Sequence, residues 1–226
     1  MHSNKNVSLV IPAHNEEEGL KQLFKTKPQF IDEVIIVDNN SSDNTFSLAK
    51  SFGANVIYLS QMGYGLACKT GLVAASGDII CLLDADNSYP IGDVEKIINY
   101  MQVGDYDFVN GCRFPLVNKI AMPLIKRVAN RSISFLIRKF FNIKLMDSQS
   151  GMFVFKKSIL LDIISSSPGM EFSQEIKLRA WLNPAVKASE FHINYAPRLG
   201  KVKYNTVKDS IKIVKSLINF LYCQPR

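Results

Sequence analysis

The sequence predicts an α/β protein with a largely parallel central sheet flanked by helices. Short apolar runs recur through the first half of the chain, and residues with helical spacing follow them. Nearly every apolar run also ends in a polar segment, as expected for buried parallel strands. Ligands bind beyond the carboxyl ends of the strands in such sheets, so the same pattern predicts where a site would lie.

Four apolar runs are expected to form strands, at residues 7–11, 34–37, 56–59 and 79–83. Three groups of apolar residues with helical spacing separate them: Leu20, Leu23 and Phe24, then Phe46, Leu48 and Ala49, then Ala67, Leu72 and Ala75. Further along, Pro123 suits the first turn of a helix that runs to about Phe141, and residues 207–222 predict a second basic amphipathic helix. No repeat or linker divides the chain, so we expect one domain over residues 1–226.

The composition is that of an ordinary globular protein. A chain of 226 residues with 47% hydrophobic and 21% charged residues has room for one substantial core. Its four cysteines are scattered without a Cys-x-x-Cys pair, which argues against a zinc site or a disulfide framework and fits a reducing cytosol. Six mostly polar residues before the first strand leave no room for a signal peptide, and no apolar run reaches the ~18 residues of a spanning helix. We therefore expect a cytoplasmic protein.

Basic residues are concentrated in two segments. Residues 114–146 contain seven basic residues and no acidic one, and residues 201–226 contain six basic residues against Asp209. Such segments are often solvated helix faces, but they also suit a phosphate-rich substrate, an anionic membrane or nucleic acid. No nucleic-acid-binding motif accompanies them, so we expect no nucleic acid partner.

The apolar run at residues 79–83 leads directly into Asp84-Ala85-Asp86. Two carboxylates this close at the end of a buried strand are unfavourable unless a positive charge lies between them. A divalent cation such as Mg²⁺ or Mn²⁺ would supply that charge, because these ions prefer oxygen ligands and leave positions open for substrate phosphates. The alternative is a polar turn that caps the strand, since Asp and Asn are common turn residues.

Two other strand ends are polar in the same way. The Pro12–Glu16 loop follows the first strand and Asp38 ends the second, so both are expected near Asp84 at one edge of the sheet. The turn Gly63-Tyr64-Gly65 resembles a dinucleotide-binding fingerprint, but Cys68 stands at its third glycine position. No acidic residue is suitably placed to hold a ribose, which argues against a nicotinamide enzyme.

Ordered segments along nearly the whole chain resemble one family. The segments VSLVIPAHNEE at 7–17, VDNNSSD at 37–43, GYG at 63–65 and DADNSYP at 84–90 resemble family 2 glycosyltransferases with the GT-A fold. Three later segments, NGCR at 110–113, DSQSG at 147–151 and RLGKVK at 198–203, are similar to the polyprenyl-phosphate branch, which includes dolichol-phosphate mannosyltransferase. The chain departs from the family pattern at Asn39, where a second Asp is common, at Ser88, where the mannosyltransferases carry Gln, and at Tyr64, which replaces the usual Lys.

The resemblance implies an inverting, metal-dependent hexosyltransferase that moves a sugar from a GDP-mannose- or UDP-glucose-type donor to a polyprenyl or dolichyl phosphate. It implies donor contacts at Pro12, Ala13, Asn15, Glu16, Asp38, Gly65, Asp84, Arg198 and Lys203. The implied ligands of Mg²⁺ or Mn²⁺ are Asp84 and Asp86, and the implied contacts of the acceptor phosphate are Arg113, Arg127 and Arg131. We expect the catalytic residues to be Asp86, Arg113, Asp147 and Glu175.

Two other functions remain open. Transfer to a sugar hydroxyl, as in surface-polysaccharide or glycolipid assembly, would require a general base, and the candidates are Asp147, Glu171 and Glu175. A phosphate acceptor is already anionic near neutral pH and requires no strong base. The third hypothesis is a non-catalytic nucleotide-sugar-binding module, against which the retention of Asp84 and Asp86 argues.

The two basic helices also predict peripheral contact with the cytoplasmic face of a membrane. Each has a basic stripe beside apolar residues, and these stripes contain Arg127, Arg131 and Arg138 in the first and Lys208, Lys212 and Lys215 in the second. Such helices can lie in an interface with their basic side chains toward anionic headgroups. The alternatives are that both apolar stripes pack on the sheet, or that the C-terminal helix contacts a membrane-embedded partner subunit.

Overall fold

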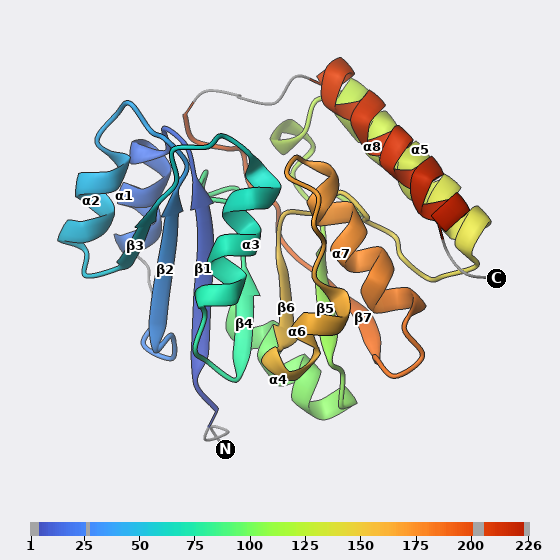
Figure 1. The fold of residues 1–226 in the computed structure, drawn as a ribbon, viewed down its shortest axis with the longest axis horizontal. Coiled ribbons are helices and arrows are strands. Elements are labelled where there is room, and N and C mark those ends of the chain that lie inside the picture. Colours follow the sequence, from blue (N-terminus) through green and yellow to red (C-terminus); the bar gives the residue numbers. More distant parts are fainter. Residues whose placement is uncertain (1–4, 26–27, 201–205, 224–226) are drawn as a thin grey trace.

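A seven-stranded sheet runs through the computed structural model, which describes residues 5–25, 28–200 and 206–223, with the backbone alone for 206–211, 222 and 223 (Figure 1). The strand order is β3 (Asn55–Tyr58), β2 (Glu33–Asp38), β1 (Val7–Ala13), β4 (Ile79–Leu82), β6 (Phe153–Lys156), β5 (Phe108–Cys112) and β7 (Ala188–His192). All neighbouring pairs are parallel except those that involve β6. The predicted α/β class with a largely parallel sheet is confirmed.

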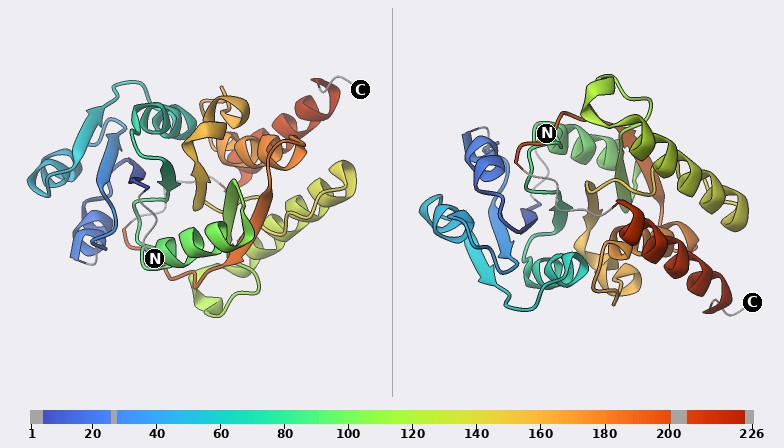
Figure 2. Two further views of the ribbon diagram at one scale, coloured as in Figure 1. Left: turned by 90° about the horizontal axis from the view of Figure 1, so that it is seen from below. Right: turned by 90° about the horizontal axis from the view of Figure 1, so that it is seen from above.

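Helices cover both faces of this sheet (Figure 2). One face packs against α1 (Glu17–Lys25), α2 (Thr45–Ser51) and α4 (Asp93–Gly104). The other packs against α3 (Tyr64–Ala74), α6 (Leu160–Ile163) and α7 (Glu171–Leu182). In β1, Leu9 and Ile11 belong to the first core whereas Val10 belongs to the second. Because alternate side chains point to opposite faces, a strand buried on both sides must be apolar throughout.

The first strand extends past Pro12, which we expected to end it. Pro12 pairs with Val37 of β2, whereas the β4 partner ends at Leu82 opposite Val10. Proline has no amide hydrogen to give to a ladder, so it is tolerated where a strand has a neighbour on one side only. The extra length carries Ala13 to the edge of the sheet where the polar loops meet.

Two long helices form a third layer beside α7. They are α5 (Leu124–Phe141) and α8 (Thr206–Cys223). Two short 3₁₀ turns, at Lys119–Ala121 and Lys157–Ile159, precede α5 and α6. Ile133 and Ile137 of α5 pack with Ile213 and Leu217 of α8 and with Leu178 of α7. The inner faces of α5 and α8 therefore cover α7 and each other, and the two helices do not lie on the sheet itself.

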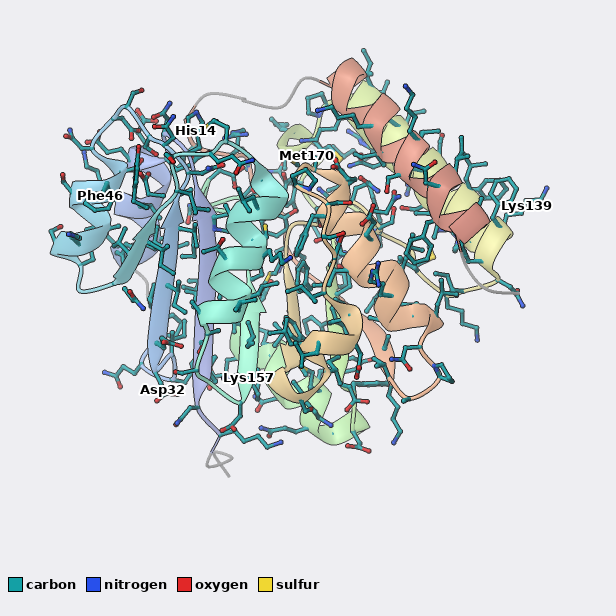
Figure 3. All side chains as sticks on the ribbon, viewed as in Figure 1. His14, Asp32, Phe46, Lys139, Lys157 and Met170 are labelled. Carbon is teal, nitrogen blue, oxygen red and sulfur yellow. The ribbon has the colours of Figure 1, made fainter. Side chains whose placement is uncertain are left out.

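The carboxyl ends of the parallel strands meet at the upper edge of the molecule in Figure 1. His14 and Met170 lie at this edge, whereas Asp32 and Lys157 lie at the opposite one (Figure 3). Polar loops from β1, β2 and β4 reach the upper edge together, as the sequence pattern predicts.

Replacing Gly71 tests how closely α3 approaches the sheet. A Cβ atom at this buried position would lie 2.4 Å from Val10 Cγ1 and 3.0 Å from Val37 Cγ2. We expect Gly71→Ala to lower the free energy of unfolding by about 1–2 kcal/mol, because overpacking outweighs the gain in helix propensity. Thermal and urea denaturation measure this change. Gly92→Ala is the control, since a Cβ there meets no atom within 4 Å. Equal stability of the two variants would contradict the close packing.

Candidate active site

A cleft of about 400 Å³ opens where the ends of β1, β2 and β4 meet. Its lining comes from the end of β1, the loops after the three strands, the start of α3 and the segment before α7, together with Arg198 and one residue of α8. The lining residues are Pro12, Ala13, His14, Glu16, Asn39, Met62, Gly63, Tyr64, Ala67, Asp84, Ala85, Asp86, Gly169, Met170, Arg198 and Lys212. Pro12, Ala13, Glu16, Asp84 and Arg198, which we expected to contact the donor, therefore share one cleft.

A smaller pocket of about 110 Å³, here called the inner pocket, adjoins the cleft. Tyr64, Asp84, Asp86, Met170 and Arg198 line both spaces. The other residues that line the inner pocket are Tyr89, Arg113, Lys126, Asn130, Gln149, Gly151, Ser173, Tyr195 and Ile213. Lys212 in the cleft and Ile213 in the inner pocket both come from α8, so this helix forms a wall of both spaces.

Asp84 lines both the cleft and the inner pocket. The Tyr64 hydroxyl donates to Asp84 Oδ1 at 2.9 Å, so the Tyr64 that replaces the expected lysine supports this carboxylate. The other oxygen packs on Gly151, where an added Cβ would lie 2.1 Å from Oδ2. Burial and then repulsion by Asp86 raise the pKa of Asp84 to about 7, and Tyr64, Arg113 and Lys126 only partly oppose them. The charge of Asp84 is thus incompletely compensated.

Asp86 is oriented by a residue that departs from the family pattern. Its Oδ1 atom accepts hydrogen bonds from the Ser88 amide at 3.0 Å and from the Ser88 hydroxyl at 2.5 Å. Its Oδ2 atom lies 3.7 Å from Arg198 Nη1, and Arg198 Nη2 donates to Glu16 Oε1 at 3.1 Å. Ser88 therefore fixes one oxygen of Asp86, while the other faces the cleft cation Arg198.

These two carboxylates fit a divalent cation. Mg²⁺ in phosphate-transfer sites is held by one or two carboxylates and takes its other ligands from substrate oxygens and water. Asp84 and Asp86 supply two hard oxygen donors, and the raised pKa of Asp84 indicates a place that favours added positive charge. Within the described residues, no group of three or more His, Cys, Asp or Glu side chains forms a complete protein site. Substrate oxygens would have to complete the coordination.

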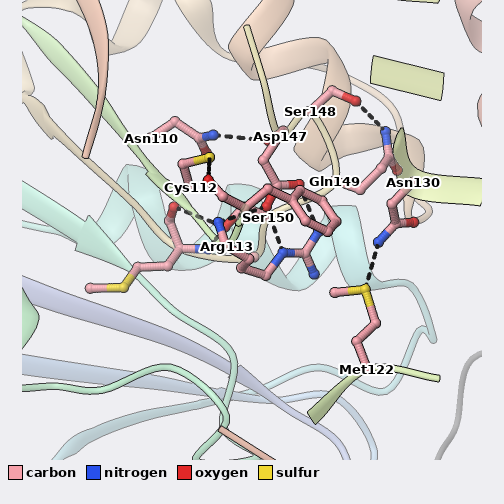
Figure 4. Close-up of polar contacts among 12 residues, drawn as sticks. Asn110, Cys112, Arg113, Met122, Asn130, Asp147, Ser148, Gln149 and Ser150 are labelled. Carbon is pink, nitrogen blue, oxygen red and sulfur yellow. Dashed lines mark hydrogen bonds and ion pairs between the residues drawn. The ribbon is translucent and has the colours of Figure 1, made fainter. Parts of the chain in front are cut away.

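Arg113 is held in the inner pocket by a buried ion pair with Asp147 (Figure 4). Arg113 is 2% exposed and Asp147 is 0% exposed. The guanidinium donates from Nε at 2.7 Å and from Nη2 at 2.8 Å, and the Arg113 amide donates to the same carboxylate. Although burial raises it, Arg113 holds the pKa of Asp147 below its usual value. Asp147 therefore positions Arg113 and is unsuited to the role of base.

Glu190 of β7 supports this ion pair and was not foreseen. Its carboxylate accepts from the amides of Met146 and Asp147, and from the Asn110 side chain at 2.9 Å. Asn110 also donates to the Asp147 carbonyl oxygen at 2.9 Å. The two segments NGCR and DSQSG are thus joined by direct hydrogen bonds, which explains why both carry polar residues.

Glu175 lies outside both spaces, contrary to our expectation of a catalytic position. Its carboxylate accepts from the hydroxyls of Ser165, Ser167 and Ser216, in a groove between α7 and α8. Glu171 lines the same groove. Ser173, two residues before Glu175, lines the inner pocket, and two positions along a helix correspond to a rotation of about 200°. The helix therefore turns Glu175 away from the site.

The arginines predicted on α5 are also displaced from the inner pocket. Arg127 donates to the carbonyl oxygens of Lys119 and Met122, and Arg131 lies 5.2 Å from the centre of the Phe114 ring. Their neighbours Lys126 and Asn130 line the inner pocket instead. Burial, and then Arg113, lowers the pKa of Lys126. The sequence signal for this pocket-lining face was the spacing of Lys126 and Asn130, a basic and a polar residue four positions apart on one helix.

Asp38 lies behind the cleft and its neighbour Asn39 lines it. The Asp38 Oδ2 atom accepts from the Ser41 amide at 3.4 Å, and Oδ1 has no hydrogen-bond partner among the described residues. Asn39 accepts from the Gly63 amide at 2.8 Å and donates to the Gln61 carbonyl at 2.7 Å. Asn39 thus ties the end of β2 to the turn before α3.

Two other predicted donor residues, Asn15 and Gly65, do not line the cleft. The Asn15 side chain accepts from the Ser42 and Asp43 amides and so joins the loops after β1 and β2. Gly65 is buried, and a Cβ there would lie 2.2 Å from the Ser167 carbonyl oxygen, so it allows α3 to approach the segment before α7. Lys203 falls outside the described residues.

Asp84→Asn should stabilise the metal-free protein at pH 8. The folded-state pKa of Asp84, about 7, exceeds its unfolded value of 3.8. Ionisation of Asp84 therefore removes stability as the pH rises from the unfolded pKa through the folded pKa. We expect the variant to melt about 2–4 °C higher at pH 8, an advantage that disappears near pH 4. Mn²⁺ should raise the melting temperature of the wild type but not of the variant. Asp162→Asn, an exposed substitution on α6, is the control. Equal Mn²⁺ stabilisation of wild type and Asp84→Asn would contradict the metal assignment.

Comparison with known proteins identifies the family. Residues 8–164 match the family model described as glycosyl transferase family 2. An uncharacterised glycosyltransferase of Mycobacterium tuberculosis is 31% identical over 194 residues, covering 86% of this chain and 87% of that protein. The dolichyl-phosphate hexose transferase of Haloferax volcanii is 27% identical over 223 residues, covering 94% and 92%.

Two further comparisons bear on length and fold. The low-salt glycan biosynthesis hexosyltransferase Agl6 of H. volcanii is 28% identical over 94% of this chain, which spans about half (53%) of that protein. The crystal structure of glucosyl-3-phosphoglycerate synthase from M. tuberculosis with Mn²⁺, UDP-glucose and phosphoglyceric acid superposes with a TM-score of 0.77. It is 18% identical, with 98% of this chain and 81% of that one covered, and so supports the fold. The chain belongs to glycosyltransferase family 2 and has the GT-A fold.

Proposed function

We propose that this glycosyltransferase moves one hexose from a nucleoside-diphosphate sugar to a polyprenyl or dolichyl phosphate, with inversion at the anomeric carbon. The observation that carries the proposal is the charge of the inner pocket. Arg113, Lys126 and Arg198 line it beside Asp84 and Asp86, and no other carboxylate among the described residues does so. Such a pocket suits an anionic acceptor, because guanidinium and ammonium groups bind phosphate oxygens. The similarity to a dolichyl-phosphate hexose transferase supports the same acceptor class.

The two spaces divide the substrates in this proposal. The donor occupies the larger cleft, and the acceptor phosphate enters the inner pocket against Arg113 and Lys126. A phosphate oxygen attacks the anomeric carbon, the bond from that carbon to the diphosphate breaks, and the nucleoside diphosphate leaves with the electron pair. A Mg²⁺ or Mn²⁺ ion held by Asp84 and Asp86 would neutralise charge on the leaving diphosphate. Arg198 is placed to contribute to the same stabilisation.

The positions of the acidic residues favour a phosphate acceptor over a sugar hydroxyl. A hydroxyl acceptor needs a base within hydrogen-bond reach. Of the three candidate bases, Asp147 is committed to Arg113, and Glu171 and Glu175 lie in the groove between α7 and α8. A non-catalytic binding module would not require Asp84 and Asp86 together at the junction of donor cleft and inner pocket.

We also propose that α5 brings the enzyme to a membrane surface, where a polyprenyl phosphate resides. Large apolar side chains on the outer face of this helix are exposed to solvent: Leu124, Ile125, Val128, Phe135, Leu136 and Phe140. Arg131 and Lys139 are exposed on the same helix, which carries no acidic residue. Apolar residues flanked by basic ones suit insertion at an anionic lipid interface. In the described part of the chain, no helix is long and apolar enough to cross a bilayer.

Lys126→Gln should weaken use of the acceptor more than use of the donor. We expect the acceptor KM to rise about tenfold with little change in donor KM, because Lys126 lines only the inner pocket. Transfer of labelled sugar from nucleotide donors to polyprenyl phosphate, followed by extraction into organic solvent, measures both constants. Lys69→Gln makes the same charge change at an exposed residue of α3 that lines neither space, and it is the control. Asp86→Asn should give no product. Product that stays in the aqueous phase for every lipid phosphate tested would contradict the proposed acceptor.

Vesicle flotation tests the membrane contact. We expect the wild type to float with vesicles that contain anionic lipid at low salt, and less at high salt. Val128→Asp combined with Phe135→Asp should reduce binding at least tenfold, because both exposed side chains would carry charge into the interface. Leu161→Asp changes an apolar residue on α6 that is even more exposed, and this variant should bind like the wild type. Equal flotation of the α5 variant and the α6 control would overturn this contact.

A further inference from the structure

Lys177 of α7 is buried inside the protein and was assigned no role by the sequence patterns. It is 0% exposed, which is uncommon for a lysine. Its ammonium group donates to the Ser148 carbonyl oxygen at 3.1 Å, to the Ser173 hydroxyl at 3.0 Å and to the Ser150 carbonyl oxygen. Lys177 Nζ also lies 5.6 Å from the centre of the Phe153 ring. Three N–H donors therefore meet three oxygens.

The loop that Lys177 holds, residues 147–151, connects two parts of the active site. At its start, Asp147 forms the ion pair that orients Arg113. At its end, Gly151 packs against Asp84, and its amide donates to the Tyr89 hydroxyl at 2.6 Å. The backbone between these ends carries the Ser148 and Ser150 carbonyl groups that accept from Lys177. One buried cation thus contacts the loop between the acceptor-site arginine and a candidate metal ligand.

Burial and the charges around Lys177 shift its pKa. Burial, and then Arg113, lowers the pKa of Lys177 to about 7, against the opposing effects of Asp147, Glu190 and Asp84. Only the protonated amine has three donors, so the full set of contacts requires the charged form. Ser173 also donates to the Ser150 carbonyl at 2.9 Å, so this oxygen accepts from two groups of α7.

We propose that Lys177 is a positioning residue of the transferase: its ammonium group fixes the backbone of Ser148 and Ser150 so that Arg113 and Asp84 face the same inner pocket. The inference rests on the proposed function for the role of Arg113 in acceptor binding. Its effect on Asp84 is independent of which acceptor is used. Lys177 touches neither substrate nor metal in this proposal, and it acts through the loop.

The variant Lys177→Met tests the proposal because methionine retains an unbranched apolar side chain but has no N–H donor. We expect kcat to fall at least tenfold and the acceptor KM to rise at least threefold, since small displacements of positioned groups are costly in rate. We also expect Mn²⁺ affinity, titrated in the presence of nucleoside diphosphate, to fall at least threefold. Metal-free nucleotide binding should be unchanged, because Pro12 and Asn39 line the cleft and no residue of the loop does.

A lysine at the opposite edge of the sheet provides the control. Lys157 donates to the Ser76 carbonyl oxygen at 3.2 Å at the opposite edge of the sheet (Figure 3). Lys157→Met makes the same substitution at an exposed lysine that lines neither space and should leave kcat, both KM values and Mn²⁺ affinity unchanged. If Lys177→Met does not fold, Ser173→Ala removes one of the three oxygens and should shift the same quantities by a smaller factor.

Two outcomes separate this inference from the proposed function. A folded Lys177→Met protein that melts at lower temperature but keeps wild-type kcat, acceptor KM and Mn²⁺ affinity would overturn the positioning role. If instead the wild type fails to use any polyprenyl phosphate, the proposed acceptor fails, and the Mn²⁺ titration still decides whether Lys177 positions Asp84. In that case, a reduced Mn²⁺ affinity of Lys177→Met, with no such change in Lys157→Met, would support the inference.

Discussion

The ion pair between Arg113 and Asp147 joins the parts of the site that come from distant segments of the chain. Arg113 follows β5, Asp147 opens the loop before β6, and Glu190 of β7 supports the Asp147 backbone. Removing one partner of such a buried pair typically costs about 3–5 kcal/mol, because the other charge remains in the interior. Arg113 is therefore kept in place by the stability of the fold, and its one guanidinium nitrogen not bonded to Asp147, Nη1, donates to Tyr89 at 3.4 Å. A cation fixed in this way needs little rearrangement when an anion arrives.

The direction of β6 decides which loops reach the site. Ligands in parallel sheets bind beyond the carboxyl ends of the strands. Because β6 runs antiparallel to β4 and β5, its amino end lies at that same edge. The loop 147–151 thus enters the site before its strand begins, which allows Gly151 to pack against Asp84. A single reversed strand adds a loop that a fully parallel sheet would send to the opposite edge.

The same geometry explains how much of the site could be predicted from the sequence. Pro12 lies at the carboxyl end of β1, and Asp84 and Asp86 follow β4, so their positions at one edge followed from the chain order. The direction of a side chain on a helix is harder to predict, because one position along the helix corresponds to a rotation of about 100°. The sequence pattern predicts Arg127 where Lys126 lines the pocket, and it predicts Glu175, which faces away from it. Lys177 meets carbonyl groups 27 and 29 residues away, and no local pattern indicates such contacts.

The place of α8 in the wall of both spaces has a consequence for biosynthesis. This helix follows every other described element along the chain, yet Lys212 and Ile213 line the cleft and the inner pocket, and Leu217 packs with Leu178 of α7. Until this segment has been synthesised and has docked, both spaces lack one side. The nascent protein would therefore hold its carboxylates and arginines in an open trough. Substrates would meet a finished enclosure only after the last described helix had docked.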